Sequence, residues 1–159
     1  MRVRDVMTKR VSTCRPDSTL EEAIQTMERE DCGFLPVIGE GGNVIGVITD
    51  RDISISLGTR NRKASELTVW EVMPSRLFTC TADDDIHSVL TTMRISAVRR
   101  LPVIDREGTT VGVVSIDDIV VHARAYGLLK DVSYKDVEDT YKAICGHARQ
   151  HPLESRAAA

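Results

Sequence analysis

Two stretches of the chain share one pattern: Gly46-Val47-Ile48-Thr49-Asp50-Arg51-Asp52-Ile53 and Gly112-Val113-Val114-Ser115-Ile116-Asp117-Asp118-Ile119. They lie 66 residues apart (118 minus 52, for example). In each stretch a strand-like apolar run ends in a hydroxyl residue, and a carboxylate follows three residues later. An internal repeat at a fixed spacing indicates duplicated structural units. The pattern therefore predicts two related pockets.

The repeat extends well beyond these stretches, because 3–53 matches 69–119 without insertion or deletion. Further matching pairs are Val6-Met7 with Val72-Met73, Thr13-Cys14 with Thr79-Cys80, and Leu35-Pro36-Val37-Ile38 with Leu101-Pro102-Val103-Ile104. Each copy alone is too small to be more than marginally stable. We expect the two copies to share a core.

Each copy is predicted to contain a short strand, a helix, two strands and a second helix. Apolar residues at helical spacing follow Ser18, which with Glu21 forms a predicted capping box, and follow Asp84 in the second copy. Strands are predicted at 34–38, 44–49, 101–104 and 110–115, and the closing helices begin near Asp50 and Ile116. Cys14 and Cys80 fall on the short first strands.

Two regions lie outside the repeat. The polar and basic segment 58–63 reads as a linker, and 131–149 as a further helix capped by Ser133 with Asp136. The apolar stripe of that helix is Tyr134, Val137, Tyr141, Ile144 and Ala148. It must dock on its own module, on a second subunit or on a partner. The predicted boundaries are 1–58, 59–66 (linker), 67–128, and 129–159 for the helix and tail.

Composition and motifs narrow the function. The net charge of −3 and the 4% aromatic content argue against nucleic-acid binding. No apolar run approaches a membrane span of about 20 residues, and the N-terminus lacks a signal core, so we expect no membrane association and a cytoplasmic location. The four cysteines form no C-x-x-C pair, and Cys145, His147 and His151 have unconvincing metal spacing, so no metal is predicted. Nucleophile-elbow, Walker and zinc-protease motifs are absent from the sequence, so we predict a protein that is not an enzyme and requires no cofactor.

The chain resembles the CBS-domain family. The resemblance rests on Asp5-Val6-Met7-Thr8 and Glu71-Val72-Met73-Pro74, on the Leu-Pro-Val-Ile segments and on the two opening stretches, and it covers about residues 3–125. It implies an α/β fold of two pseudo-twofold-related units (a Bateman module) packed through their sheets, with ligand clefts between them. Family members sense adenosine compounds (AMP, ADP, ATP, NAD(H) or S-adenosylmethionine) and signal to another protein. They commonly dimerise, which implies a homodimer here.

Four residues are the main binding candidates: Thr49 and Asp52 in the first copy, Ser115 and Asp118 in the second. An ionised carboxylate can accept hydrogen bonds from both ribose hydroxyls, and charge-assisted bonds are roughly twice as strong as neutral ones. The hydroxyl residues can bond ribose or phosphate, and a helix N-terminus favours phosphate. The alternative is that both aspartates only cap their helices.

The remaining candidates would line the adenine slot or face phosphate. They are Phe34, Val37 and Val103 on the strands, Arg51 and Arg100, and the repeat equivalents Thr13 and Thr79. Arg51 in the first copy corresponds to Asp117 in the second, so we expect two unequal sites. The alternative for both arginines is a solvated surface position.

Three functions are compatible with the sequence. The first is an adenosine-nucleotide sensor that acts on a separate, unknown protein partner. The second is a dimerisation or interaction module with vestigial pockets. The third is a thiol-based redox regulator using Cys14 or Cys80, although buried, reduced thiols are the simpler interpretation of these residues.

Overall fold

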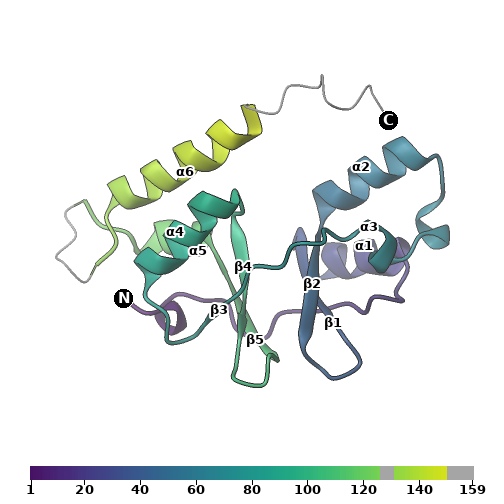
Figure 1. Ribbon diagram of the computed structural model, residues 1–159, viewed down its shortest axis with the longest axis horizontal. Coiled ribbons are helices and arrows are strands. Elements are labelled where there is room, and N and C mark those ends of the chain that lie inside the picture. Colours follow the sequence, from purple (N-terminus) through teal and green to yellow (C-terminus); the bar gives the residue numbers. More distant parts are fainter. Residues whose placement is uncertain (126–130, 150–159) are drawn as a thin grey trace. The chain divides into compact units, whose positions relative to one another are not determined.

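Two β-hairpins, each flanked by helices, form the framework of the protein. The computed structural model describes residues 1–125 and 131–149, with side chains described as far as residue 146. The elements are η1 (Val3–Asp5), α1 (Leu20–Arg29), β1 (Phe34–Ile38), β2 (Val44–Thr49), α2 (Asp50–Arg60), η2 (Ala64–Glu66), α3 (Val69–Val72), β3 (Cys80–Thr81), α4 (Ile86–Ser96), β4 (Arg100–Ile104), β5 (Thr110–Ser115), α5 (Ile116–His122) and α6 (Tyr134–Arg149) (Figure 1). The predicted α/β fold is confirmed. The predicted short first strand forms at Cys80 as β3, whereas Cys14 makes only an isolated bridge to Val37.

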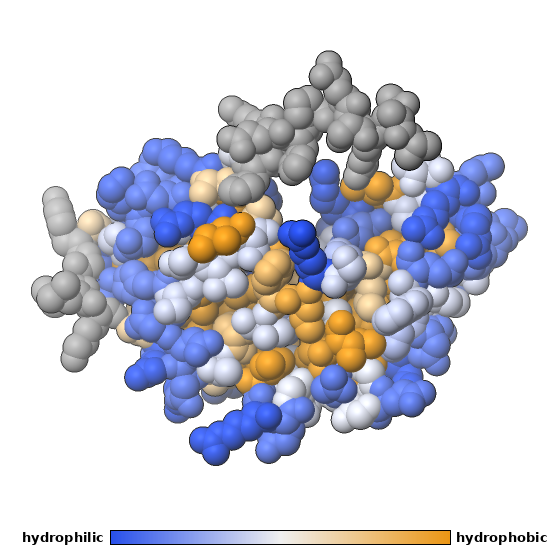
Figure 2. All heavy atoms as spheres, in the orientation of Figure 1, coloured by the Kyte–Doolittle hydropathy of each residue, from blue (hydrophilic) through white to orange (hydrophobic). Residues whose placement is uncertain are grey.

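The hairpins position the two candidate stretches. β1 pairs antiparallel with β2, so that Thr49 at the end of β2 lies opposite Phe34 at the start of β1. The second sheet has the order β3-β4-β5. Gly42 (φ 81°) and Gly108 (φ 82°) occupy the left-handed region in the two hairpin turns, a conformation that glycine adopts without strain. On the face drawn in Figure 2, hydrophobic residues gather over the strands.

The chain divides into two compact units that do not follow the sequence repeats. One unit contains 1–8, 80–103 and the chain from Val113 onward, and the other contains 9–79 and 104–112. We call the first the C-terminal unit and the second the N-terminal unit, after the part of the chain that supplies most of each. The boundaries predicted above, 1–58 and 67–128, follow the sequence repeats and not these two units, and they remain a prediction.

The segment that opens each repeat joins the unit built mainly from the other repeat. In the C-terminal unit, the Val3 N–H donates to the Asp84 carbonyl at 3.0 Å and the Thr8 N–H to the Val113 carbonyl at 2.9 Å. In the N-terminal unit, the Leu20 N–H donates to the Leu67 carbonyl at 2.9 Å. Leu67 is fully buried in the core around Leu20 and Leu35. Backbone hydrogen bonds and apolar burial both hold these exchanged segments.

The first helix of each repeat begins one residue later than predicted. Thr19, not Ser18, caps α1: its Oγ1 accepts from the Glu22 N–H at 3.2 Å, and the Glu22 carboxylate accepts from the Thr19 N–H at 2.8 Å. The Ser18 hydroxyl instead accepts from the Arg15 N–H in the preceding turn. Competition from local turns explains the shift, because serine bonds equally well to turn and helix backbone.

Asp85, not Asp84, caps α4. The Asp85 carboxylate accepts from the His87 N–H at 2.9 Å. Asp84 is already used, since its carboxylate accepts from the Thr81 N–H at 2.8 Å. Two adjacent aspartates can both serve as caps, and the sequence alone does not decide between them.

Helix α6 packs against α4 and α5 of the same chain (Figure 1). The predicted Ser133–Asp136 cap is confirmed, with the Asp136 carboxylate accepting from the Ser133 N–H at 2.9 Å. The predicted apolar stripe is only partly right. Val137 and Ile144 are buried, but Tyr134 is 56% and Tyr141 36% exposed, and the buried face includes Thr140 instead. The Thr140 hydroxyl can enter the interface because it donates to the Asp136 carbonyl at 2.8 Å. The side chain of Ala148 lies outside the described residues.

Candidate functional site

The first candidate site is built on the start of α2. The Thr49 Oγ1 accepts from the Asp52 N–H at 3.2 Å. The Asp52 Oδ2 accepts from the Thr49 N–H at 3.0 Å and from the Thr49 hydroxyl at 2.6 Å. Thr49 and Asp52 thus form a reciprocal capping box, which fixes the rotamers of both side chains. No described residue donates to the other carboxylate oxygen, Oδ1.

The second candidate site repeats this geometry at the start of α5. The Asp118 Oδ2 accepts from the Ser115 N–H at 2.8 Å and from the Ser115 hydroxyl at 2.5 Å, and the Asp118 N–H donates to Ser115 Oγ at 3.0 Å. The exchanged N-terminal segment adds a contact, since the Thr8 hydroxyl donates to Asp118 Oδ1 at 3.4 Å. A long, weak bond of this kind is easily replaced by a better donor.

Capping uses only one of the two oxygens of each aspartate carboxylate. Both aspartates cap their helices, because Oδ2 of each completes a capping box. Each carboxylate oxygen carries two lone pairs, so Oδ1 keeps its capacity to accept. Asp52 and Asp118 are both half-buried rather than sealed in the core. Capping therefore orients the carboxylates without consuming them.

The predicted strand residues differ from these aspartates in their exposure. Val37 and Val103 are fully buried and Phe34 is 9% exposed. Their side chains belong to the core, so these strands can offer a ligand only limited apolar surface. Thr13 is exposed and Thr79 half-buried. The structure gives these two threonines no contact with the carboxylates.

The predicted basic residues also have different surroundings in the two copies. Arg51 is exposed on the first turn of α2, where the Asp50 carboxylate accepts from its N–H at 2.7 Å. Arg100 lies 3.9 Å from the carboxylate of Asp117, which occupies the position equivalent to Arg51. The second site thus has its arginine paired with an acid. The two copies are unequal in charge arrangement, as predicted from the sequence.

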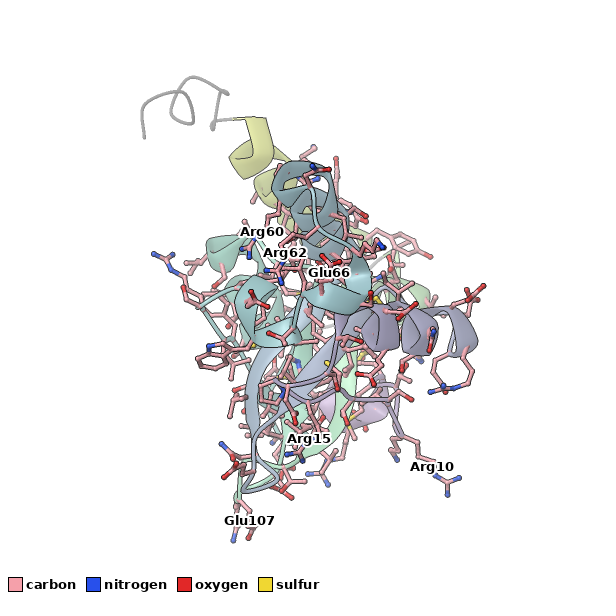
Figure 3. All side chains as sticks on the ribbon, turned by 90° about the vertical axis from the view of Figure 1, so that its right-hand side faces the viewer. Arg10, Arg15, Arg60, Arg62, Glu66 and Glu107 are labelled. Atoms are coloured by element: carbon pink, nitrogen blue, oxygen red, sulfur yellow. The ribbon has the colours of Figure 1, made fainter. Side chains whose placement is uncertain are left out.

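The arginines that follow the first copy are occupied. The Arg60 guanidinium donates to the Glu71 carbonyl at 2.9 Å, and Arg62 to the Glu71 carboxylate at 3.1 Å and to the Glu66 carbonyl. Figure 3 shows Arg60, Arg62 and Glu66 gathered in one region. Hydrogen bonds to the Glu71 carboxylate from the Thr68 N–H, at 2.9 Å, and from the Arg62 guanidinium lower the pKa of Glu71. Segment 58–63, predicted as a linker, belongs to the N-terminal unit, and its first three residues belong to α2.

Ser56 is a site candidate that sequence reasoning missed. It lies one helical turn after Asp52, is 6% exposed, and its hydroxyl has no hydrogen-bond partner among the described residues. Residues four apart share a helix face, so Ser56 follows Asp52 on α2. The equivalent residue of the second copy is His122, whose Nδ1 lies 2.8 Å from the Asp118 carbonyl. The i, i+4 spacing from the aspartates could have identified both.

The structure does not favour the redox interpretation of Cys14 and Cys80. Cys14 is 8% exposed and Cys80 6%. Burial raises the pKa of each thiol to about 12. The thiolate is the reactive species, so these two thiols are poorly suited to redox signalling. Cys145 is exposed.

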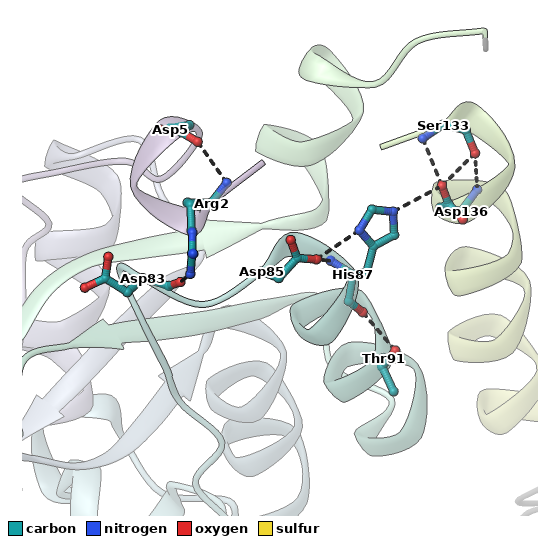
Figure 4. A network of polar contacts seen from close by, with 8 residues as sticks. All are labelled: Arg2, Asp5, Asp83, Asp85, His87, Thr91, Ser133 and Asp136. Atoms are coloured by element: carbon teal, nitrogen blue, oxygen red, sulfur yellow. Dashed lines mark hydrogen bonds and ion pairs between the residues drawn. The ribbon is translucent and has the colours of Figure 1, made fainter. Parts of the chain in front are cut away.

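A polar network joins the start of α4 to α6 (Figure 4). His87 Nδ1 lies 2.9 Å from the Asp85 carboxylate, and its Nε2 lies 3.8 Å from that of Asp136. Hydrogen bonds from Ser133 lower the pKa of Asp136, and the His87 N–H lowers that of Asp85. Among the side chains that the structure describes, no group of three His, Cys, Asp or Glu residues could hold a metal ion. The side chains of His147 and His151, considered above, are not among them.

Comparisons with known proteins agree with this architecture. The family model for the CBS domain matches residues 3–58 and 69–124. The CBS domain-containing protein YhcV of Bacillus subtilis is 30% identical over 139 residues, covering 85% of this chain and 97% of YhcV. Hypoxic response protein 1 of Mycobacterium tuberculosis is 32% identical over 142 residues, covering 89% and 92%. A homoserine O-acetyltransferase of Methanohalophilus mahii is 31% identical over 117 residues, which span 23% of that enzyme.

Solved structures confirm the predicted fold. The CBS domain pair of protein MJ0100, in complex with 5′-methylthioadenosine and S-adenosyl-L-methionine, superposes with a TM-score of 0.69 at 26% identity, covering 76% of this chain and 94% of that one. Hypoxic response protein 1 with two coordinated zinc ions gives a TM-score of 0.70 at 31% identity, covering 78% and 100%. No helix in the described part of this chain is both long and apolar enough to span a membrane.

Proposed function

Because the chain belongs to the CBS domain family, whose tandem pairs are regulatory modules, we propose that it binds an adenosine compound and thereby regulates a separate protein. The observation that carries this proposal is the duplicated capping box. In both copies a half-buried carboxylate is held by its own helix cap while its Oδ1 keeps accepting capacity. A fixed acceptor suits the adjacent hydroxyls of a ribose, and little side-chain entropy is lost on binding.

The nature of the ligand follows from the helix starts. Each aspartate lies in the first turn of a helix, where backbone N–H groups favour an anion. The proposed ligands are therefore AMP, ADP, ATP or NAD(H). The adenosine compounds bound by the CBS pair of MJ0100 carry a sulfur substituent and no phosphate, so 5′-methylthioadenosine and S-adenosylmethionine belong in the same test.

The test is a titration of the full chain by calorimetry and thermal unfolding with each of these compounds, with guanosine nucleotides as controls. Saturation at a hundredfold excess over Kd should stabilise the protein by about 2.7 kcal/mol. An absence of response to every adenosine compound at millimolar concentration would overturn the proposal and leave an interaction module with vestigial pockets.

The proposal includes a homodimer and a cytoplasmic location. A sensor must be located where its ligand is present, and the ligand proposed here is a cytoplasmic metabolite. Light scattering of the full chain at micromolar concentration should give twice the mass of the chain. A monomer at that concentration would contradict the dimer and leave the ligand proposal standing.

A further inference from the structure

His87 lies between two carboxylates that belong to different helices (Figure 4). Its Nδ1 is 2.9 Å from the carboxylate of Asp85, which caps α4, and its Nε2 is 3.8 Å from that of Asp136 in the first turn of α6. All three side chains are partly exposed, so solvent protons reach them. His87 thus joins a helix of the second copy to the helix that follows the repeat.

The contact with Asp85 decides where a neutral His87 ring carries its proton. A carboxylate only accepts hydrogen bonds, so the proton of the neutral ring must be on Nδ1. Nε2 then presents a lone pair toward the Asp136 carboxylate, and these two groups repel each other. Protonation turns Nε2 into an N–H donor and makes the ring a cation, so that both contacts become attractive. The contact with α4 is therefore attractive in both states, whereas the contact with α6 reverses its sign.

The two carboxylates remain anions over the range in which histidine titrates. The hydrogen bond from the His87 N–H lowers the pKa of Asp85. Hydrogen bonds from the hydroxyl and the N–H of Ser133 lower the pKa of Asp136. Histidine side chains change charge between about pH 5 and 8, well above the range of such carboxyl groups. A change of pH in this range therefore acts on the imidazole and not on its two acceptors.

Two cations act on the same carboxylates. The Met1 amino group lowers the pKa of Asp85 by its charge, and Lys135 does so for Asp136, each as a smaller effect than the hydrogen bonds. Lysine keeps its charge throughout this range, and α-amino groups titrate near pH 8. Below about pH 7, the imidazole of His87 is thus the group of this network whose charge changes.

The first copy does not have this arrangement in its sequence. Its residues equivalent to Asp85 and His87 are Thr19 and Glu21. A glutamate at the position of His87 would repel Asp136 at any pH in this range. The histidine is found in the copy whose helix α4 packs against α6.

We propose that His87 forms a pH-sensitive contact, which holds α6 on α4 more firmly when the imidazole is protonated. Acidification from about pH 7.5 to 5.5 should tighten the docking of α6, and this gain should be lost as pH rises through the titration range of histidine. The proposal concerns the helix that follows the repeat and does not depend on the binding of a nucleotide.

Hydrogen–deuterium exchange measured by mass spectrometry tests this docking, because the amides of α6 exchange when the helix opens. Protection factors remove the intrinsic dependence of amide exchange on pH. The amides of α6 should be about two- to fivefold more protected at pH 5.5 than at pH 7.5, a size that fits a partly exposed ion pair. The amides of α1, which belongs to the other unit, should show no such change.

Two variants remove the contact in different ways. His87→Gln has a polar side chain that does not titrate, and Asp136→Asn removes the charge that the imidazolium faces while keeping an acceptor for the Ser133 cap. Each should abolish the greater protection of α6 at pH 5.5. His122→Gln is the matched control and should keep the full response. The Nδ1 of His122 lies 2.8 Å from the Asp118 carbonyl, and no described carboxylate forms an ion pair with this ring.

Equal protection of α6 at the two pH values in the natural sequence would overturn the proposal. An unchanged pH response in His87→Gln would do the same, as would an equal loss of the response in His122→Gln. A response of α1 as large as that of α6 would also contradict it, because unfolding of the whole molecule would then depend on pH. A response confined to α6 that disappears in both His87→Gln and Asp136→Asn would support the proposed contact.

Discussion

At the scale of single residues, Asp52 and Asp118 each use one carboxylate oxygen for the helix cap and, in the proposed function, the other for the ligand. Replacing each with asparagine removes the charge and keeps a side-chain acceptor for the helix cap. We expect Asp52→Asn to weaken one site and Asp118→Asn the other, each by about 1.5–3 kcal/mol, because each loses charge-assisted hydrogen bonds. Calorimetric titration of each variant with the tightest adenosine ligand measures the loss.

A neighbouring acid provides the matched control for the first copy. Asp50→Asn makes the same change two residues before Asp52. The Asp50 carboxylate accepts from the Arg51 N–H and does not close the capping box with Thr49. Full affinity and stoichiometry in both Asp52→Asn and Asp118→Asn would show that the two aspartates act only as caps.

The buried thiols give a second prediction at this scale. The pKa of Cys14 and Cys80 is raised from 9.0 to about 12, so the fold favours the neutral thiol. Unfolded chains lose these protons near pH 9, and stability should therefore fall as pH rises from about 9 toward 12. At pH 8, a maleimide should label Cys145 rapidly, and Cys14 and Cys80 only after unfolding. Rapid labelling of Cys14 in the folded protein would restore the redox interpretation.

The sequence predicted the residues whose chemistry depends on local spacing. The Thr49–Asp52 and Ser115–Asp118 pairs are three residues apart, and that spacing alone brings hydroxyl and carboxylate together at a helix start. It could not predict that Thr8 reaches Asp118, because that contact joins residues far apart in the chain. Nor could it predict the unsatisfied hydroxyl of Ser56, because burial of a serine depends on tertiary packing.

At the scale of elements, α6 depends on its cap and on its contacts with α4. Ser133→Ala removes the hydroxyl that accepts from the Asp136 N–H and donates to the Asp136 carboxylate. We expect a loss of about 1 kcal/mol in the free energy of unfolding, which chemical denaturation measures. Ser88→Ala, at an exposed position of α4, is the comparison and should change stability much less. Equal losses in the two variants would show that the cap is not important for α6.

The polar network of Asp85, His87 and Asp136 should also affect the stability of the protein at low pH. Bonds from Ser133 lower the pKa of Asp136 below its ordinary value of 3.8, and the His87 N–H lowers that of Asp85. A depressed carboxyl pKa contributes stability that is present above the unfolded value and lost as pH falls through the folded value. Below about pH 4, the free energy of unfolding should therefore fall less steeply with decreasing pH in Asp136→Asn than in the natural sequence. Identical acid profiles would contradict this.

Helix boundaries show where local reasoning stops. Ser18 and Thr19, or Asp84 and Asp85, are chemically equivalent caps, and tertiary hydrogen bonds decide between them. The Ser18 carbonyl accepts from the Val69 N–H at 2.8 Å, a bond that joins α3 to the start of α1. The buried face of α6 likewise centres on Thr140 because of the surface of α4 and α5, which the helical pattern of α6 itself does not contain.

At the scale of the whole molecule, duplication explains the fold, and divergence between the copies explains the proposed functions. The repeat predicted the element order, because each copy must bury the same apolar faces. It did not predict the exchange of opening segments, in which 1–8 joins the C-terminal unit. Either pairing would satisfy the same local pattern, and only the length and path of the connecting chain select one of them.

Divergence between the copies should make the two ligand sites unequal. Arg51 is unpaired by any described carboxylate, whereas the equivalent Asp117 lies 3.9 Å from Arg100. An exposed cation at a helix start attracts phosphate, and an acid at the same position repels it. The first site should therefore bind ATP more tightly than the second, and the two should be closer in affinity for 5′-methylthioadenosine, which carries no phosphate.

Calorimetry at low and high salt tests this prediction, because screening should narrow the difference in ATP affinity between the two sites. Arg51→Asp, which gives the first site the acid of the second, should narrow the difference in ATP affinity even at low salt. Two sites with equal affinity for ATP, insensitive to salt and to Arg51→Asp, would contradict the assignment of this asymmetry to charge.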